Sequence, residues 1–434
     1  MKISKIKISK LYNSYSYNFD LTKAEGNICI FTGPNGYGKT TVLQIIDSLS
    51  KIDLLFFYTI TFDFISIIFD NNDELVVKTD NERKDIISDK KDTSDFPSFI
   101  EFEYKIHKAK TINQLKFSLT DFFKFLPRSF FKNTNLSIID EISIDILREY
   151  LNNNIELYEK YAAENGQEQL LFLFRRINVF FIPAQRLFYI NQEEFSQYHY
   201  RLEKQKKSSI EKMVNSLQEL LEKARLDYLL VTQKHDNNFI HKLLSSRNGY
   251  SEKEYNDKAA VLKKHIEEIH SFNMIDSIKI LPYAQEHKNI LSTYLDDWEE
   301  KLASYDQIIK KLRLFSEIVN AKQFTNKNLV FSPQNGLSII TTPGKHIDIN
   351  KLSSGEKNEL IMLYHFIFDV KDSSILLIDE PEISLHVAWQ LQFLEDIEKI
   401  TKVKNIQIIL ATHSPQIINN NWMNCFDFYK YEGK

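Results

Sequence analysis

Alternating apolar and polar residues at the start of the chain predict a half-buried strand, because a period of two places successive side chains on opposite faces of a sheet. Residues 1–10 read MKISKIKISK, and a second apolar run over residues 28–31 meets a glycine-rich turn. Residues 40–50 then have the character of a helix. The first fifty residues therefore predict strand, strand, glycine-rich turn and helix in succession.

Two further apolar runs, residues 64–69 and 75–78, flank the polar sequence DNND and predict a β-hairpin. Residues 99–106 and 115–119 have the composition of additional strands. Between the hairpin and these strands, residues 81–97 are rich in charge, and we expect an exposed loop there. The N-terminal part of the chain is thus predicted to be rich in strands.

Helical periodicity replaces strand character after residue 183, and charges are dense and nearly balanced between residues 201 and 320. This pattern predicts a mainly helical insertion, with a pair of antiparallel helices as one arrangement. Strand character returns at residues 329–332 and 337–341. The apolar positions that recur at helical spacing are Met213, Leu217, Leu220, Ala224 and Tyr228, followed by Tyr294, Trp298, Leu302, Tyr305, Ile309 and Leu312.

Net charge, cysteine content and hydrophobicity exclude several kinds of site and partner. The chain has 434 residues and a net charge of −4, so no global basic field indicates nucleic acid or an anionic membrane as partner. Only Cys29 and Cys425 are present, which excludes a disulfide framework and a Cys-rich zinc site and favours a reducing cytoplasm. The most apolar stretch, residues 54–69, is shorter than the ~20 residues that cross a bilayer. We expect buried core there and no membrane contact.

Residues 33–40, GPNGYGKT, fit the pattern G-x-x-x-x-G-K-[ST] between an apolar strand and a helix. The backbone N–H groups of such a loop converge on phosphate oxygens, aided by the positive end of the following helix. Lys39 would neutralise the β- and γ-phosphates of ATP, and the Thr40 hydroxyl would ligate Mg²⁺. The nucleotide-binding residues predicted from this loop are Gly33, Asn35, Gly36, Gly38, Lys39, Thr40 and Thr41.

A second motif, ILLIDEP over residues 375–381, is an apolar strand that ends in two carboxylates. Acids at the end of a buried strand are costly unless they meet a cation or water. We expect Asp379 to hold the Mg²⁺ shell and Glu380 to orient or deprotonate the attacking water. The alternative, a strand that merely ends in surface acids, is disfavoured because the phosphate-binding loop is also present.

The sequence LSSGEK, residues 352–357, lies just before the acidic strand. At this point the chain resembles the ABC ATPase superfamily, whose signature motif is LSGGQ-like. The resemblance implies that the signature helix binds the γ-phosphate held by a second protomer, so that two sites are completed in a dimer. Ser353, Gly355 and Glu356 match the phosphate-contacting positions, with Glu356 in place of the usual Gln.

The same resemblance implies three further motifs. Residues 384–386 lie where the superfamily has its D-loop, and residues 411–414, ATHS, match the switch-histidine motif. His413 would then sense the γ-phosphate as a catalytic residue. Residues 180–186 are the candidate Q-loop, in which Gln185 could complete the Mg²⁺ shell. Arg186 could instead contact a phosphate or the dimer partner.

An aromatic side chain near the first strand could stack on adenine. Tyr12, Tyr15 and Tyr17 are the candidates, and the sequence does not choose among them.

The phrase LLIDEPEISLHVAWQ, residues 376–390, resembles the stand-alone AAA family ATPases related to the OLD (overcoming lysogenisation defect) nucleases. This resemblance covers the phosphate-binding block and roughly the last hundred residues. OLD nucleases continue into a TOPRIM domain, for which we expect no room before Lys434. Relatives without TOPRIM include ATPase subunits of the anti-phage systems Septu, PARIS and some retrons. The resemblance therefore implies a separately encoded nuclease or toxin as effector.

These patterns predict an α/β fold: an ABC-type P-loop ATPase head, with a mixed sheet and an antiparallel β lobe, that carries a large helical insertion. The predicted domains are residues 1–190 and 324–434 for the head and 191–323 for the insertion. The expected protein is a cytoplasmic ATPase, using ATP and Mg²⁺, that forms a homodimer or larger homo-oligomer and regulates its effector.

Two alternatives to effector control stay open. One is a DNA-repair ATPase similar to RecF or Rad50, which clamps DNA and requires a basic dimer surface. The other is an ATP-gated assembly scaffold with little turnover. Salt-dependent duplex binding would favour the first, and negligible phosphate release would favour the second.

Overall fold

The computed structural model describes residues 1–79, 99–108, 110–127, 144–184, 209–246, 249–322, 327–341, 344–383, 385 and 387–430. Contacts divide the described residues into two compact units. The first unit holds those of residues 1–186 and 370–434, and the second holds those of residues 205–369. Residues 324–369, which the sequence predicts to belong to the head, are grouped with the helical unit in this division.

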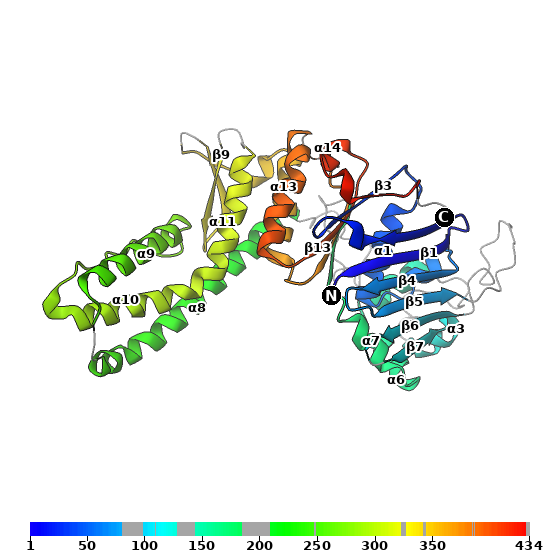
Figure 1. The fold of residues 1–434 in the computed structure, drawn as a ribbon, viewed down its shortest axis with the longest axis horizontal. Coiled ribbons are helices and arrows are strands. Elements are labelled where there is room, and N and C mark those ends of the chain that lie inside the picture. Colours follow the sequence, from blue (N-terminus) through cyan, green and yellow to red (C-terminus); the bar gives the residue numbers. More distant parts are fainter. Residues whose placement is uncertain are drawn as a thin grey trace. The chain divides into compact units, whose positions relative to one another are not determined.

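A parallel sheet of five strands forms the centre of the first unit (Figure 1). Its strands are apolar along their length, as expected for a sheet buried on both faces, and every residue of β12 and β13 is buried. Because neighbouring strands are all parallel, their carboxyl ends meet at one edge. The order is β14 (Cys425–Asp427), β3 (Ile28–Thr32), β13 (Gln407–Ala411), β12 (Ile375–Asp379) and β8 (Val179–Ile182).

An antiparallel sheet of six strands is the second sheet of this unit and confirms the predicted hairpin at residues 64–78. β7 begins at Thr111, four residues before the predicted strand. Its first four residues are polar or exposed yet pair in register with β6, so they carry little hydrophobic signal. The order is β2 (Tyr15–Asp20), β1 (Ile3–Leu11), β4 (Phe64–Phe69), β5 (Glu74–Thr79), β6 (Ile100–Ile106) and β7 (Thr111–Phe117).

The two sheets share one hydrophobic core in the first unit. The apolar stretch over residues 54–69 lies in this core, with Leu55, Phe57 and Ile65 fully buried, which confirms that prediction. The predicted loop at residues 81–97 lies outside the described residues. The helices of this unit are α1 (Lys39–Lys51), α2 (Phe56–Thr59), α3 (Leu119–Phe122), α5 (Ile144–Asn152), α6 (Glu156–Glu164), α7 (Glu168–Phe174), α13 (Val387–Val403) and α14 (Pro415–Ile418).

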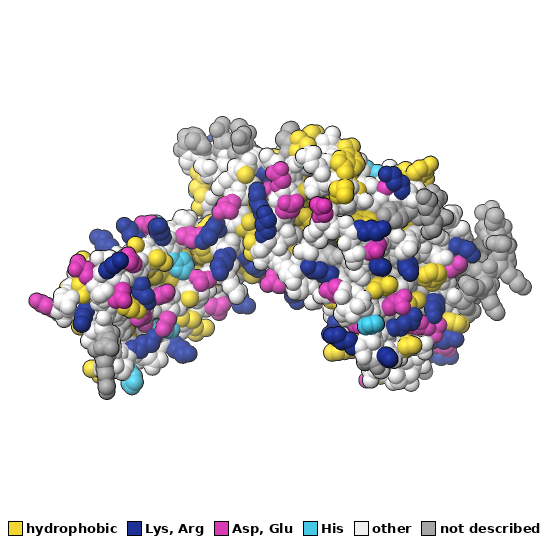
Figure 2. Space-filling model, viewed as in Figure 1, with side chains coloured by type: hydrophobic (Ala, Val, Ile, Leu, Met, Phe, Trp, Pro, Cys, Tyr) yellow, Lys and Arg dark blue, Asp and Glu magenta, His cyan; other side chains and the backbone are white. Residues whose placement is uncertain are grey.

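The second unit is mainly helical. Its described residues form four α-helices before the next strand, not the single antiparallel pair considered from the sequence. On the face shown in Figure 2, side chains of both signs are interspersed over these helices. The four are α8 (Ser209–Ser245), α9 (Glu252–Ser271), α10 (Lys288–Leu302) and α11 (Asp306–Ala321).

A small antiparallel sheet follows, in the order β11 (His346–Ile347), β10 (Gly336–Thr341) and β9 (Lys327–Ser332). The signature segment then forms α12 (Ser354–Tyr364), which continues as a short π-helix over His365–Asp369. The side chains of Lys322, at the end of α11, and Glu359, on α12, form an ion pair of 2.5 Å and are each 1% exposed. This buried pair ties the signature helix to the helical part of the unit.

No helix within the described part of the chain is long and apolar enough to cross a membrane.

Candidate functional site

The glycine-rich loop between β3 and α1 has a backbone that only glycine adopts readily. Gly38 is the N-cap of α1 with φ of 81°, in the left-handed region. A Cβ atom at this position would lie 2.8 Å from Cδ2 of Leu11. Gly33 has φ of 134°, and its Cβ would lie 3.1 Å from Cβ of Phe428. Both the turn and the close packing of the loop therefore require glycine.

Lys39, the first residue of α1, has its ammonium group at this loop. Its Nζ donates hydrogen bonds of 2.9 Å to the carbonyl oxygens of Gly33 and Pro34. Burial lowers the pKa of Lys39, and the nearby carboxylates of Glu380 and Asp379 act in the opposite direction. The loop thus holds a fixed cation with two acids close to it.

Thr40 and Asp379 meet where the phosphate-binding loop and the acidic strand end. The Thr40 hydroxyl donates to the Asp379 carboxylate, 3.0 Å from Oδ1 and 3.1 Å from Oδ2. The contact forms because β3 and β12 lie on either side of β13 and end at the same sheet edge. Hydroxyl and carboxylate oxygens are the ligands that Mg²⁺ prefers, so the pair fits that ion.

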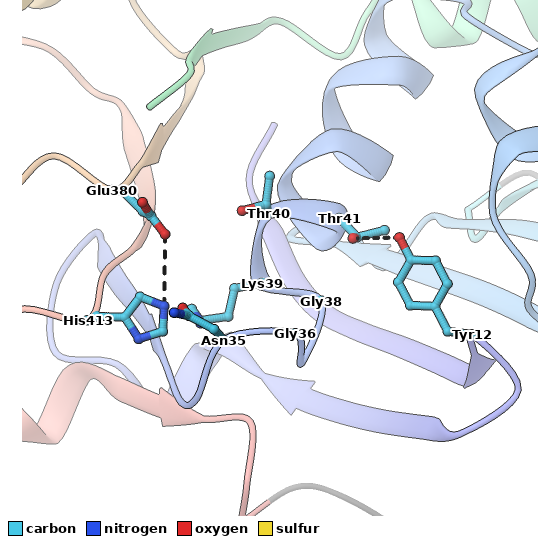
Figure 3. Close-up of a pocket in the computed structure, with 9 residues that line it drawn as sticks. All are labelled: Tyr12, Asn35, Gly36, Gly38, Lys39, Thr40, Thr41, Glu380 and His413. Atoms are coloured by element: carbon cyan, nitrogen blue, oxygen red, sulfur yellow. Dashed lines mark hydrogen bonds and ion pairs between the residues drawn. The ribbon is translucent and has the colours of Figure 1, made fainter. Parts of the chain in front are cut away.

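Glu380 follows the end of β12 with φ of 43°, an unusual conformation for a residue with a side chain. Its amide donates to the carbonyl oxygen of Ala411 on β13 at 2.9 Å. Its carboxylate Oε1 lies 3.9 Å from Nε2 of His413 (Figure 3). The left-handed turn therefore keeps the backbone pairing while the side chain faces the histidine.

His413 lies two residues beyond the end of β13. Its amide donates to Oε1 of Glu382 at 2.7 Å. Burial and the positive charge of Lys39 lower the pKa of His413, and the carboxylates of Glu380 and Glu382 oppose them. The net effect is a lowered pKa, which disfavours the imidazolium form.

These residues surround a cleft of about 290 Å³ in the first unit (Figure 3). Tyr12 stands at its rim, 43% exposed, and its hydroxyl lies 3.0 Å from that of Thr41. Of the other two tyrosines considered, Tyr17 is buried and Tyr15 packs on Tyr37. The residues lining the cleft are Tyr12, Asn35, Gly36, Gly38, Lys39, Thr40, Thr41, Glu380 and His413.

The signature residues begin α12 in the second unit. Ser353 is the N-cap and forms a capping box with Glu356: its hydroxyl accepts from the Glu356 amide and donates to the Glu356 carboxylate. Gly355 lies between them in the first turn. Nζ of Lys327, the first residue of β9, is 2.5 Å from the other carboxylate oxygen of Glu356. Burial raises the pKa of Glu356, but Lys327 and Ser353 outweigh it and lower the pKa.

Four residues predicted for the Q-loop and D-loop, Gln185, Arg186, Ser384 and His386, lie outside the described residues. The strand predicted to precede the Q-loop is present as β8 and pairs in parallel with β12.

Sequence reasoning missed three side chains of these sites. Glu382 could have been noticed as the next acid after Glu380. Gln390 bridges the acidic segment to the histidine segment, because its Nε2 donates to the Leu385 carbonyl and its Oε1 accepts from Ser414. Lys327 is 29 residues from Glu356, and no local pattern links the two.

Residues 1–418 match the family described as AAA ATPase domain. The chain belongs to this family. The predicted fold class, an α/β P-loop ATPase head with a helical insertion, is confirmed, and the cleft of this AAA ATPase is its candidate ATP site. A comparison with curated protein sequences finds no match.

Solved structures similar to this AAA ATPase include head domains of SMC proteins. One is the head from Pyrococcus furiosus with an extended coiled coil, bound to the C-terminal domain of ScpA. Its sequence identity to this chain is 13% and the TM-score is 0.36, and the alignment covers 96% of this chain and 91% of that chain. Another is the head from Thermotoga maritima, with 10% identity, TM-score 0.31 and the same two coverages. A third, bound to the C-winged helix domain of ScpA, has 14% identity, TM-score 0.34 and coverages of 97% and 92%.

Proposed function

We propose that this AAA ATPase binds and hydrolyses ATP at sites that are completed when two copies dimerise. The hydrogen bond between Thr40 and Asp379 carries the proposal. It joins the phosphate-binding loop to the acidic strand, with Glu380 and His413 beside it. ATP hydrolysis needs three parts: a loop that binds phosphate, oxygen ligands for Mg²⁺, and a carboxylate that orients water.

Each residue of the cleft has a proposed task. Lys39 and the amides of the loop bind the β- and γ-phosphates. Thr40 and Asp379 would hold Mg²⁺, with Gln185 as a further proposed ligand, and the bound ion would neutralise phosphate charge. Glu380 orients the attacking water and takes its proton. His413 donates a hydrogen bond toward the γ-phosphate.

The γ-phosphate is proposed to contact the signature residues of a second copy. Ser353 is exposed and caps α12, so the positive N-terminal end of the helix faces an approaching anion. The Ser353 hydroxyl donates to Glu356 in this structure and would turn to donate to the phosphate. Gly355 has no side chain that would obstruct the approach of the phosphate to the start of α12. Glu356 would repel phosphate if its charge were not offset by Lys327.

Tyr12 is the proposed aromatic contact for the base of ATP, because it is the tyrosine of the three that lines the cleft.

Steady-state phosphate release, measured with Lys39→Ala as the control, tests hydrolysis. Release by the wild-type chain that Lys39→Ala abolishes supports the proposal, and turnover indistinguishable from that of Lys39→Ala would favour the scaffold alternative.

We further propose that ATP-driven dimerisation regulates a separately encoded nuclease or toxin in anti-phage defence, with the cytoplasm as its location. This part rests on the resemblance of residues 376–390 to OLD-related ATPases. The helical insertion supplies surface for the effector or for a larger oligomer. The purified chain should cleave neither DNA nor RNA, and nuclease activity that survives Lys39→Ala and Glu380→Gln would refute a separate effector.

A further inference from the structure

The second unit contains a cavity of about 550 Å³ that is open to solvent, and all the described residues that line it belong to this unit. Pockets of roughly 300–1,000 Å³ are the usual size for small-molecule ligands. Its walls come from α8, the end of α9, the segment after α9, α10 and the turn between β9 and β10. The nucleotide chemistry described above uses none of these elements.

Three aromatic residues, Tyr228, Trp298 and Tyr305, line the cavity. The rings of Tyr228 and Tyr305 stack at 4.9 Å with an angle of 25° between their planes. Tyr305 is fully buried, and its hydroxyl donates to the carbonyl oxygen of Met274 at 3.3 Å. Trp298, which also lines the cavity, lies under the ammonium of Lys301, 5.5 Å from the ring centroid. Such rings offer flat, polarisable surface to a planar ligand.

The cavity is preformed, because the turn after α9 is pinned. Asn273 adopts a left-handed conformation, with φ of 56°, and its side-chain amide donates to the carbonyl oxygen of Phe331 on β9 at 2.8 Å. Tyr305 holds the next residue of the same turn through its hydroxyl. A site that is ordered before binding loses less conformational entropy when its ligand arrives.

Three polar side chains at the cavity, those of Arg225, His270 and Asp276, are exposed to solvent. Elsewhere in this unit, Lys301 is held by Asp297 and Asp236 at 2.6 Å each. By contrast, the guanidinium of Arg225 and the imidazole of His270 form no hydrogen bond or ion pair with the described residues. The Asp276 carboxylate is likewise without a partner within the described part of the chain.

We propose that this cavity binds a small ligand that combines a planar aromatic ring with a phosphate, of the size and chemistry of a nucleoside monophosphate. The ring stacks against Tyr228 and Trp298, and Arg225 binds the phosphate through its planar pair of N–H donors. His270 adds a second donor, and Asp276 accepts from an amino or hydroxyl group. The site is distinct from the ATP cleft, and its occupancy does not depend on hydrolysis.

Titrations of the full chain with AMP, GMP, CMP and UMP test this proposal. They are made in the Lys39→Ala background, so that the ATP cleft contributes little binding. Isothermal calorimetry gives the affinity, and quenching of Trp298 fluorescence gives a second, local readout. Trp298→Phe should remove the quenching, and Trp422→Phe, which alters an exposed tryptophan of the first unit, should retain it.

Arg225→Gln should weaken the best monophosphate about tenfold or more, because a charge-assisted contact to phosphate is lost. It should leave the affinity of the matching nucleoside unchanged, whereas Tyr228→Ala should weaken both. Lys223→Gln is the matched control: it removes one exposed positive charge from α8 outside the cavity and should change neither.

The proposal is overturned if none of the four monophosphates binds at about 1 mM, or if Arg225→Gln and Lys223→Gln have equal affinities. Either result is separable from failure of the ATP site, because that site is read by phosphate release in chains with an intact Lys39.

Discussion

Asp379 and Glu380 are adjacent in the chain but lie in different environments. Asp379 ends a buried strand, is 5% exposed and accepts from Thr40. Glu380 leaves the strand in a left-handed conformation, and its side chain is 31% exposed next to His413. A non-glycine residue in that conformation costs on the order of 1 kcal/mol. The left-handed turn at Glu380 directs the two neighbouring carboxylates to different positions. The position of Asp379 is suited to Mg²⁺, and that of Glu380 is suited to water.

Glu380→Gln should retain ATP binding but lower the hydrolysis rate about 100-fold or more, because loss of a general base costs that much. Glu382→Gln is the matched control, since this acid contacts the amide of His413 and should have a smaller effect. Equilibrium binding of labelled ATP and steady-state phosphate release measure the two quantities. Turnover by Glu380→Gln at the wild-type rate would show that Glu380 is not the base.

The pKa of His413 should report the charges around it in the nucleotide-free protein. Lys39 opposes protonation of the imidazole, so Lys39→Ala should raise the pKa. Glu380 favours the imidazolium, so Glu380→Gln should lower the pKa further. Hydrogen–deuterium exchange at the imidazole C2 position, followed by mass spectrometry, measures the value for each variant. A lowered pKa in Lys39→Ala, or a raised pKa in Glu380→Gln, would contradict the arrangement of charges in the cleft.

At the scale of elements, the start of α12 is held by two contacts from Glu356. One carboxylate oxygen completes the capping box with Ser353, and the other pairs with Lys327 on β9. The side chains of Lys327 and Glu356 are 24% and 13% exposed, so the pair is largely shielded from solvent. A Gln at this position would be neutral, whereas Glu356 is a carboxylate paired with the ammonium of Lys327.

Lys327→Ala should weaken ATP-dependent dimerisation about tenfold, because it leaves the Glu356 charge unbalanced at the proposed phosphate contact. Glu356→Gln in the same chain should restore dimerisation, since the carbonyl oxygen of Gln can still cap the helix without the charge. Lys345→Ala, at an exposed lysine of the same unit, is the control. Analytical ultracentrifugation with ATP gives the dimer affinity, and absence of rescue by Glu356→Gln would exclude charge balance as the cause.

The buried pair of Lys322 and Glu359 gives a stability prediction for the second unit. Lys322→Met should lower the free energy of unfolding by about 3–5 kcal/mol, because a buried carboxylate then loses its counter-charge. Lys322→Met combined with Glu359→Leu should recover most of that loss, since no buried charge remains. Urea denaturation followed by circular dichroism measures both. A single variant as stable as the wild type would show that the pair is not buried in solution.

The sequence predicted those parts of the site whose residues are close together in the chain. The loop at residues 33–40 and the acids that end β12 were recognisable because local spacing and apolar strands determine their positions. The pairing of Lys327 with Glu356 and of Tyr12 with Thr41 depends on tertiary contacts between separate elements. Periodicity likewise indicates a helical insertion but does not give the number of its helices. The apolar pattern in this region is too weak to mark where the turns between α8 and α11 lie.

At the scale of the whole molecule, the two proposed halves of the ATP site belong to different compact units. Lys39, Thr40 and Asp379 lie in the first unit, and Ser353 and Glu356 lie in the second. If each site uses the first-unit residues of one copy and the signature of another, hydrolysis must depend on protein concentration. The same requirement would let any partner that binds the helical unit influence turnover.

Mixing two inactive variants tests the composite site most directly. Lys39→Ala removes the phosphate cation, and Ser353→Arg fills the proposed seat of the partner's γ-phosphate. Each variant alone spoils both sites of a symmetric dimer, but a mixed dimer has one site with both motifs intact. An equimolar mixture should therefore recover roughly a quarter of the wild-type ATPase rate, by random pairing in a twofold dimer. A mixture as inactive as its components, or full activity of Ser353→Arg alone, would contradict completion of the site by a second copy.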